Sequence, residues 1–138
     1  MTDPLEIASA ARAVMLEATA AAHPREACGL LFGSAARIDA ASVAENVADD
    51  PLTTFEIDPQ ALIDAHRAAR NGGAQVIGCW HSHPNGRPVP SAADAAAAAS
   101  GTIWLVLADG DARAFAALEG GFTERSLVTP LHNLGGTA

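Results

Sequence analysis

The sequence predicts a single α/β domain of three-layer-like arrangement, in which helices flank a mixed and mostly antiparallel sheet. Three observations carry this prediction. Helical segments with capping signals alternate with short apolar runs that are typical of buried strands. An Asp109-Gly110 pair marks a hairpin, and no repeat or linker divides the 138 residues. We therefore expect one domain over residues 1–138, with a frayed tail from about residue 130 to residue 138.

The first predicted helix lies near the N-terminus. Asp3, Pro4 and Glu6 supply an N-cap, a favourable first helical position and a capping-box partner. Apolar residues then recur at helical spacing up to residue 18. His23-Pro24 ends this helix, because the residue before a proline avoids the helical conformation. The apolar run from Cys28 to Phe32 predicts a short inner strand.

The middle of the chain continues this alternation. Residues 38–47 form a weaker strand candidate, and residues 48–54 are expected to form a loop with Asp49-Asp50-Pro51 at its centre. Asp58-Pro59 begins a second helix, which ends at Asn71-Gly72-Gly73. The run from Val76 to Ser82 is the clearest buried strand of the sequence.

The last third predicts one helix and a set of antiparallel strands. Prolines and an Asn85-Gly86 turn stiffen residues 84–90, and Ser91 caps an alanine-rich helix that reaches Ala99. Residues 103–107 predict a strand, which the Asp109-Gly110 hairpin joins to a partner ending at residue 118. Gly120-Gly121 allows a further turn into a strand over residues 122–127.

Charge and composition argue against several classes of partner. The chain has 16 Asp and Glu against 8 Lys and Arg, and its formal net charge is −8, so its surface would repel nucleic acid. No apolar run approaches the ~20 residues of a membrane span, and the N-terminus lacks the pattern of a signal peptide. Two cysteines are too few for a disulfide scaffold. We expect a cytoplasmic protein without nucleic-acid or membrane partners.

The residues with the strongest chemical pattern lie between positions 81 and 94. His81 and His83 are two apart on a predicted strand, so their imidazoles point to one side, and the proline-rich loop returns Asp94 to the strand end. Three protein ligands are the number that catalytic zinc keeps. The pattern has other readings, because His-x-His is common and Ser91-x-x-Asp94 is an ordinary capping box. Cys79 shares the parity of His81, and we expect it to be a buried apolar side chain.

Two separated motifs resemble the JAMM metallopeptidases, also called the MPN-plus family. The run His81-Ser82-His83, seven residues, Ser91, two residues and Asp94 looks like the family signature. The segment Pro24-Arg25-Glu26-Ala27-Cys28-Gly29-Leu30-Leu31 resembles the family's glutamate-bearing element. The order of elements matches from about Leu5 to Leu127 and lacks long insertions, as in compact prokaryotic members. The resemblance implies the JAMM/MPN fold, which is cytidine-deaminase-like.

Carried over residue by residue, the resemblance implies one zinc ion per chain with His81, His83 and Asp94 as ligands. It further implies that Glu26 is the general base, which takes a proton from the attacking water and passes it to the leaving amine. Ser91 would donate a hydrogen bond to the tetrahedral oxyanion. Without the resemblance, Glu26 would be taken for a solvated side chain after a helix.

The resemblance also implies a substrate class, namely the amide bond after the C-terminal Gly-Gly of a ubiquitin-like or sulfur-carrier protein. Glycine lets such a tail approach a metal closely, and we expect the loop from Asn46 to Phe55 to form one wall of its site. Two alternatives stay open, a RadC-like DNA-associated protein and a peptidase of phage-tail assembly. A non-catalytic MPN scaffold is disfavoured because every ligand is present. Homodimer formation also stays open.

Overall fold

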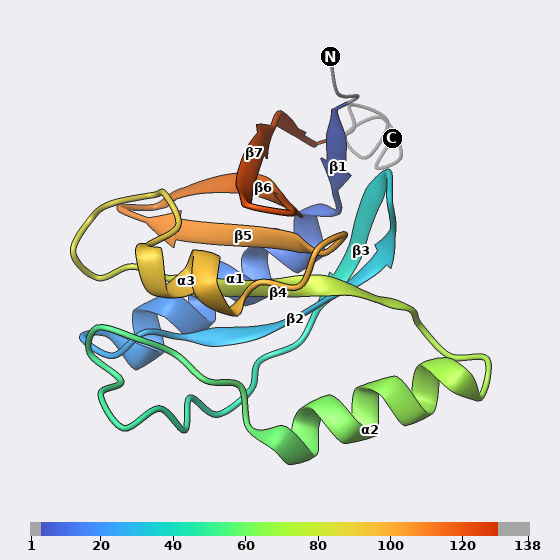
Figure 1. Ribbon diagram of the computed structural model, residues 1–138, viewed down its shortest axis with the longest axis horizontal. Coiled ribbons are helices and arrows are strands. Elements are labelled where there is room, and N and C mark those ends of the chain that lie inside the picture. The colour runs from blue at the N-terminus through green and yellow to red at the C-terminus, as the bar shows by residue number, and fades with distance from the viewer. Residues whose placement is uncertain (1–3, 130–138) are drawn as a thin grey trace, which may run out of the picture.

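The computed structural model describes residues 4–129. It shows a mixed sheet with helices on both of its faces (Figure 1). This arrangement confirms the predicted α/β class. The elements within the described residues are β1 (Leu5–Ile7), α1 (Ser9–Ala22), β2 (Cys28–Ser34), β3 (Arg37–Ala41), α2 (Pro59–Arg70), β4 (Val76–Ser82), α3 (Ala92–Ala97), β5 (Ile103–Ala108), β6 (Asp111–Leu118), β7 (Gly121–Arg125) and β8 (Leu127–Val128).

The strands follow the order β7-β6-β5-β4-β2-β3-β1-β8. Neighbours pair antiparallel from β7 to β5 and from β4 to β3, whereas β4 and β5 run parallel because α3 connects them. β7 and β8 are consecutive in the chain but stand at opposite ends of this order. The sheet therefore curls until its two edges meet near Ser126, whose carbonyl oxygen accepts the Leu5 amide at 2.8 Å.

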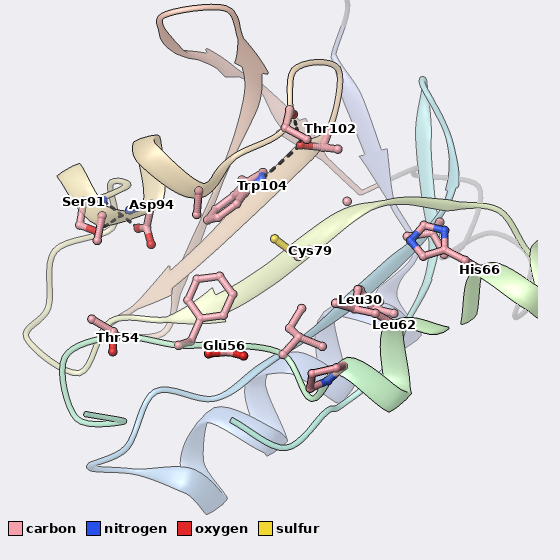
Figure 2. Close-up of a pocket in the computed structure, with 18 of the residues that line it drawn as sticks. Leu30, Thr54, Glu56, Leu62, His66, Cys79, Ser91, Asp94, Thr102 and Trp104 are labelled. Carbon is pink, nitrogen blue, oxygen red and sulfur yellow. Dashed lines mark hydrogen bonds between the residues drawn. The ribbon is translucent and has the colours of Figure 1, made fainter. Parts of the chain in front are cut away.

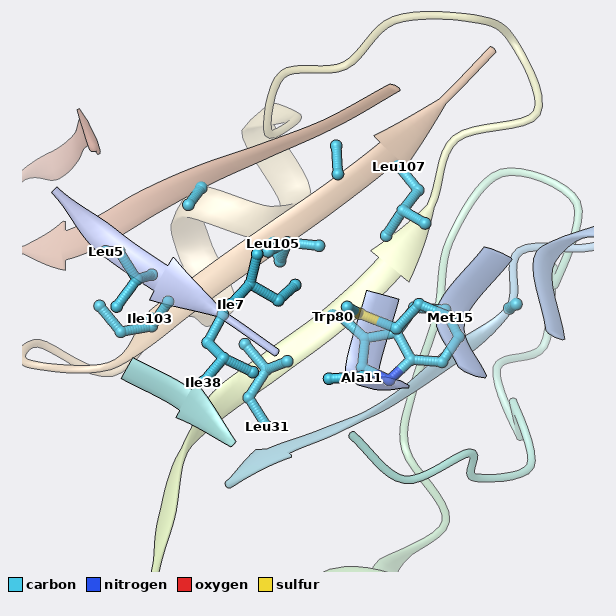
Figure 3. Close-up of a cluster of buried hydrophobic side chains, with 13 residues drawn as sticks. Leu5, Ile7, Ala11, Met15, Leu31, Ile38, Trp80, Ile103, Leu105 and Leu107 are labelled. Atoms are coloured by element: carbon cyan, nitrogen blue, oxygen red, sulfur yellow. The ribbon is translucent and has the colours of Figure 1, made fainter. Parts of the chain in front are cut away.

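Side chains alternate between two apolar clusters on opposite faces of the sheet. In β4, Trp80 belongs to the first cluster and its neighbour Cys79 to the second. Figure 3 shows the first cluster, which α1 covers with Ala11 and Met15. The second cluster lies on the side of α2 and α3, and it forms the floor beside the candidate site.

The first helix begins later than the sequence predicts. Asp3 lies outside the described residues, and the segment after it forms β1, which pairs in parallel with β3 and β8. α1 starts only at Ser9, and Glu6 binds Arg37 at 3.0 Å instead of capping a helix. The side chains of Leu5 and Ile7 are fully buried in the core. Burial at a spacing of two residues thus outweighs the local capping signal.

Two further boundaries differ from the prediction. β3 ends at Ala41, although the Ser42 amide still donates to the Leu30 carbonyl at 3.0 Å. The Leu30 amide binds the Ser42 hydroxyl instead of a backbone carbonyl, which interrupts the regular ladder. Residues 42–47 therefore keep only isolated bridges to the sheet and to the following loop. α3 ends at Ala97, before the predicted Ala99, because Ala98 adopts an extended conformation and packs against the second apolar cluster.

The remaining strands and α2 match the predicted ranges to within two residues, apart from the break at residue 126. The predicted frayed tail lies outside the described residues. No described helix is long and apolar enough to cross a membrane.

We expect Leu105→Ala to destabilise the fold strongly, because Leu105 in β5 is 0% exposed. The free energy of unfolding should fall by about 2–5 kcal/mol, the usual loss for a buried leucine. Leu118→Ala is the matched control, since Leu118 is 53% exposed and its loss should stay within about 0.5 kcal/mol. Urea denaturation measures both values. Equal losses in the two variants would contradict the packing described for β5.

Candidate metal centre

The predicted metal ligands lie at the carboxyl end of β4. His81 is inside β4, His83 follows its last residue, and Asp94 lies in the first turn of α3. The parallel strands β4 and β5 are joined through α3, and ligands of α/β sheets commonly bind outside the carboxyl ends of such strands. The loop over residues 84–90 returns the chain to this strand end, as the sequence predicts.

Three side-chain atoms converge at this point. His81 Nε2 lies 2.9 Å from His83 Nε2 and 3.1 Å from Asp94 Oδ2. His83 Nε2 lies 3.4 Å from the same carboxylate oxygen. All three residues are buried. Two buried imidazoles and a carboxylate are costly to desolvate unless they are paired or hold a metal.

The donor set fits a tetrahedral zinc ion. Zinc bonds of about 2.0–2.2 Å place tetrahedral ligand atoms about 3.3–3.6 Å apart. The three atoms here are separated by 2.9, 3.1 and 3.4 Å, so two of the distances must lengthen by a few tenths of an ångström to receive the ion. His83 Nδ1 donates to the carbonyl oxygen of Arg87 at 2.7 Å. This bond fixes the tautomer and leaves the Nε2 lone pair for a metal. Three protein ligands suit a catalytic rather than a structural zinc site.

In the described part of the chain, the His81 ring, unlike that of His83, is not oriented by a hydrogen bond at Nδ1. Its Nδ1 is buried and has no hydrogen-bond partner among the described residues, whereas a metal-ligating imidazole usually donates this N–H. Aromatic packing holds the ring instead. Phe55 stacks on it with 4.3 Å between ring centroids and 18° between planes, and Trp104 packs against it edge-on at 5.8 Å. Packing thus replaces the usual hydrogen bond behind this imidazole.

Asp94 and Ser91 form the capping box that the sequence suggests. Asp94 Oδ2 accepts the Ser91 amide at 2.8 Å, and Ser91 Oγ accepts the Asp94 amide at 3.1 Å. The same Oδ2 lies beside both imidazoles, so the capping role and the place beside a metal are compatible. Because Ser91 Oγ acts as an acceptor here, its hydroxyl hydrogen can still be donated to another group.

Glu26 joins the cluster from the segment between α1 and β2. One oxygen of this buried carboxyl group and ring nitrogens of His81 and His83 all lie within 4.8 Å of one another. The Glu26 amide donates to the carbonyl oxygen of Pro51 at 2.8 Å. Burial raises the pKa of Glu26 to about 7, with His83 opposing the rise and Asp94 adding to it. A carboxyl group with this pKa is suited to proton transfer near neutral pH.

The pKa shifts of Asp94 and His81 suit a divalent metal, whereas the shift of His83 favours its protonated form. Burial opposes ionisation of Asp94, but hydrogen bonds from His81 and His83 outweigh it and lower the pKa of Asp94. Burial lowers the pKa of His81. Burial also works against a charged His83, yet its bonds to Asp94 and to the Arg87 carbonyl raise the pKa of His83. An ionised carboxylate and a neutral imidazole are the forms that bind a metal.

The two cysteines lie near the site but keep their protons. Burial raises the pKa of Cys28 to about 12 and also raises the pKa of Cys79. A metal ligand or nucleophile must be a thiolate. Both cysteines pack in the second apolar cluster, which confirms that Cys79 acts as a buried apolar side chain.

An apolar groove of about 540 Å³ leads away from Ser91 and Asp94 along β4. Figure 2 shows Ser91 and Asp94 at one end of the groove and His66 at the other, with Cys79 between them. Its apolar lining includes Leu30, Ile57, Leu62, Val76, Cys79 and Trp104. Residues 53–55, the last part of the loop from Asn46 to Phe55, line one side of the groove.

The structure brings together all five residues that the sequence singles out, His81, His83, Asp94, Glu26 and Ser91. Sequence reasoning missed three contacts around them: the Phe55 ring, the Arg87 carbonyl and the Asn46 side chain, which binds the backbone of Glu26. A backbone carbonyl leaves no trace in a sequence. Phe55 and Asn46 stand in an aperiodic segment, where no pattern marks one side chain above its neighbours.

Residues 8–118 match the family of prokaryotic homologues of the JAB domain, Prok-JAB. This chain belongs to that family. The matched span runs from the residue before α1 to the end of β6 and contains all five predicted site residues. It confirms the compact prokaryotic JAMM/MPN type that the two motifs indicate.

Two curated proteins are similar to this Prok-JAB domain. The desampylase of Haloferax volcanii is 37% identical over 93 residues, which cover 65% of this chain and 67% of the relative. A probable TtuB-protein conjugate cleaving protease of Thermus thermophilus is 32% identical over 97 residues, 70% of this chain and 65% of the relative. The chain thus spans about two thirds of the length of each relative.

Comparison with solved structures confirms the fold. AF2198 of Archaeoglobus fulgidus, a JAB1/MPN domain protein, superimposes with a TM-score of 0.60 at 22% identity and covers 92% of this chain and 100% of that protein. The solution structure of the protein DSY2949 from Desulfitobacterium hafniense superimposes with a TM-score of 0.79 at 24% identity. The superposition covers 91% of this chain and 92% of that protein. Together with the buried group of Glu26, His81 and His83, membership of this family fits a zinc-dependent hydrolase.

The geometry of Asp94 generates a metal-binding prediction. Asp94→Ala should weaken zinc binding by more than about 10-fold, which is the loss that even outer partners of a metal site cause. Asp94→Asn keeps an oxygen for the Ser91 amide, so it should retain the helix cap while its lost charge still weakens zinc binding. Competition with a chromophoric chelator measures the affinities. Unchanged zinc affinity in both variants would leave Asp94 with the capping role alone.

Proposed function

We propose that this chain is a zinc-dependent peptidase or isopeptidase that hydrolyses the amide bond after the C-terminal Gly-Gly of a ubiquitin-like or sulfur-carrier protein. One observation supports this proposal above all others. The imidazoles of His81 and His83 and the Asp94 carboxylate converge at the end of an apolar groove, and the Glu26 carboxyl group lies beside them. The names of the two relatives, a desampylase and a TtuB-protein conjugate cleaving protease, support the substrate class.

In this proposal His81, His83 and Asp94 hold one zinc ion per chain. The zinc supplies Lewis acidity, which polarises a carbonyl group and makes water a nucleophile near neutral pH. His83 is held by the Arg87 carbonyl and His81 by the Phe55 ring. These supports keep both imidazoles aimed at one point, which preorganises the site before substrate binds.

In the reaction Glu26 transfers protons and Ser91 stabilises the negative charge that develops on the substrate. The Glu26 carboxylate takes a proton from the attacking water and delivers it to the leaving amine, a role that its burial beside both imidazoles supports. The Ser91 hydroxyl donates a hydrogen bond to the developing oxyanion. This donation is compatible with the capping box, in which Ser91 Oγ only accepts.

The groove suits an extended tail. Along β4 from His81 to Val76 a tail of five residues covers about 16 Å, at about 3.3 Å per residue. Its two terminal glycines lie beside the metal ligands, where the absence of a Cβ allows close approach. The residues before them lie over the apolar side chains of the groove, such as Leu30 and Trp104.

The proposal also covers the setting of the enzyme. All five site residues come from one chain, so a homodimer is not needed to complete the site. We further propose a single catalytic domain over residues 1–138 that acts in the cytoplasm, without nucleic-acid or membrane partners. The formal charge of −8 supports this view over a RadC-like, DNA-associated role.

Metal analysis combined with cleavage assays tests the function. The zinc-loaded protein should contain about one zinc ion per chain and should cleave fusions directly after a Gly-Gly carrier tail. A chelator should abolish cleavage and added zinc should restore it. A carrier whose tail ends in Ala-Ala is the matched control and should be a poor substrate. Cleavage that persists after complete removal of the metal, or no cleavage of any Gly-Gly carrier, would refute the proposal.

Glu26→Gln should separate metal binding from turnover. The amide keeps the size of the side chain but cannot accept the proton, so kcat should fall by about 10²–10⁴-fold while the zinc content stays unchanged. Glu17→Gln is a matched control, because Glu17 is an exposed residue of α1. Steady-state cleavage and metal analysis give the two readouts. Full activity in Glu26→Gln would remove Glu26 from the mechanism.

A further inference from the structure

The side chain of Asn46 is fully engaged in hydrogen bonds behind the candidate site. Its Nδ2 donates to the carbonyl oxygens of Glu26 and Thr54, both at 3.0 Å. Its Oδ1 accepts the amides of Ala48 at 3.0 Å and Glu56 at 3.1 Å. A carboxamide has two N–H donors and two acceptor lone pairs, so every one of them is used. The partners leave only one orientation of the amide.

These bonds connect two segments that carry parts of the site. One partner is the backbone of Glu26, which stands in an irregular segment between α1 and β2. Two others, Thr54 and Glu56, flank Phe55, whose ring stacks on His81. The isolated bridge between Asn46 and Ile57 brings the same segments together. A single side chain therefore links the proposed base to the ring that orients a proposed metal ligand.

We infer that Asn46 is a positioning residue that holds Glu26 and Phe55 in register with the metal ligands. Irregular backbone has no ladder of hydrogen bonds to fix it, so the place of the Glu26 carboxyl group depends on a few tethers. One tether is the bond from the Glu26 amide to the Pro51 carbonyl, and Asn46 supplies the tether on the carbonyl side. A displacement of about 1 Å can cost about 10²-fold in rate.

The chemistry of the partners explains why this position suits asparagine. Two carbonyl oxygens need donors and two amides need acceptors, and one planar carboxamide serves all four. Aspartate has the same shape but would turn an oxygen toward the carbonyls of Glu26 and Thr54. Serine avoids this repulsion, but its shorter side chain cannot reach all four groups. The two substitutions therefore perturb the same tethers by different routes.

The inference rests on the proposed function, because its main readout is cleavage of a Gly-Gly carrier. Asn46→Asp should lower kcat by about 10–100-fold per zinc-loaded molecule, with zinc content unchanged and KM within about threefold. Asn46→Ser should show the same pattern. Asn71→Asp makes the same chemical change at the exposed end of α2 and should keep the kcat of the unchanged protein.

Hydrogen exchange gives a readout that needs no substrate. In Asn46→Asp the Glu26 amide should lose protection, because repulsion displaces the Glu26 carbonyl that Asn46 holds. In Asn46→Ser the amides of Ala48 and Glu56 should lose protection as well, because their acceptor is removed. Amides of β5 should keep their protection in both variants. If the unchanged protein cleaves no carrier, the proposed function fails and this exchange pattern alone judges the role of Asn46. A kcat per zinc-loaded molecule within twofold of the unchanged protein, or a fully protected Glu26 amide, would overturn the inference. If neither variant folds, Asn46 is a structural residue and the positioning role is rejected.

Discussion

The site depends on the return of the chain from the end of β4 to the start of α3. This connection brings Asp94 beside His81 and His83, although 13 and 11 positions, respectively, separate them from it in the sequence. The parallel pairing of β4 with β5 fixes where α3 lies, and the capping box with Ser91 fixes how its first turn is presented. Apart from the Nδ1 of His81, the buried polar atoms of these residues have a partner or converge on a common point, which lowers the cost of burying them.

The other residues of the site lie on irregular backbone. Glu26 and Phe55 lie outside the regular elements, and their places depend on hydrogen bonds from Asn46 and to Pro51. The last part of the loop from Asn46 to Phe55 lines one side of the groove. The groove proposed for the substrate and the proposed base are therefore linked through one segment, which is why the inference gives Asn46 an effect on turnover without contact to metal or substrate.

Asp94 shows how one local pattern can serve two purposes. Ser91-x-x-Asp94 is compatible with a helix cap and with a metal site, and the sequence offers no means of choosing between them. In the structure a single oxygen, Oδ2, accepts the Ser91 amide and lies beside both imidazoles. The cap orients the carboxylate toward the histidines, so the two readings reinforce rather than exclude each other.

Local patterns determined much of this protein: the ranges of β4 and α2, the common side of His81 and His83, and the hairpin at Asp109-Gly110. These features depend on periodicity and turn chemistry, which neighbouring residues carry. Only the tertiary structure decided that Leu5–Ile7 form β1, because the partners of that strand include β8, more than 100 residues away. The contacts of Glu26 with His81 and His83 belong to the same class. The motif resemblance pointed to Glu26, but its burial beside the imidazoles arises from pairing between β2 and β4, which no local pattern encodes.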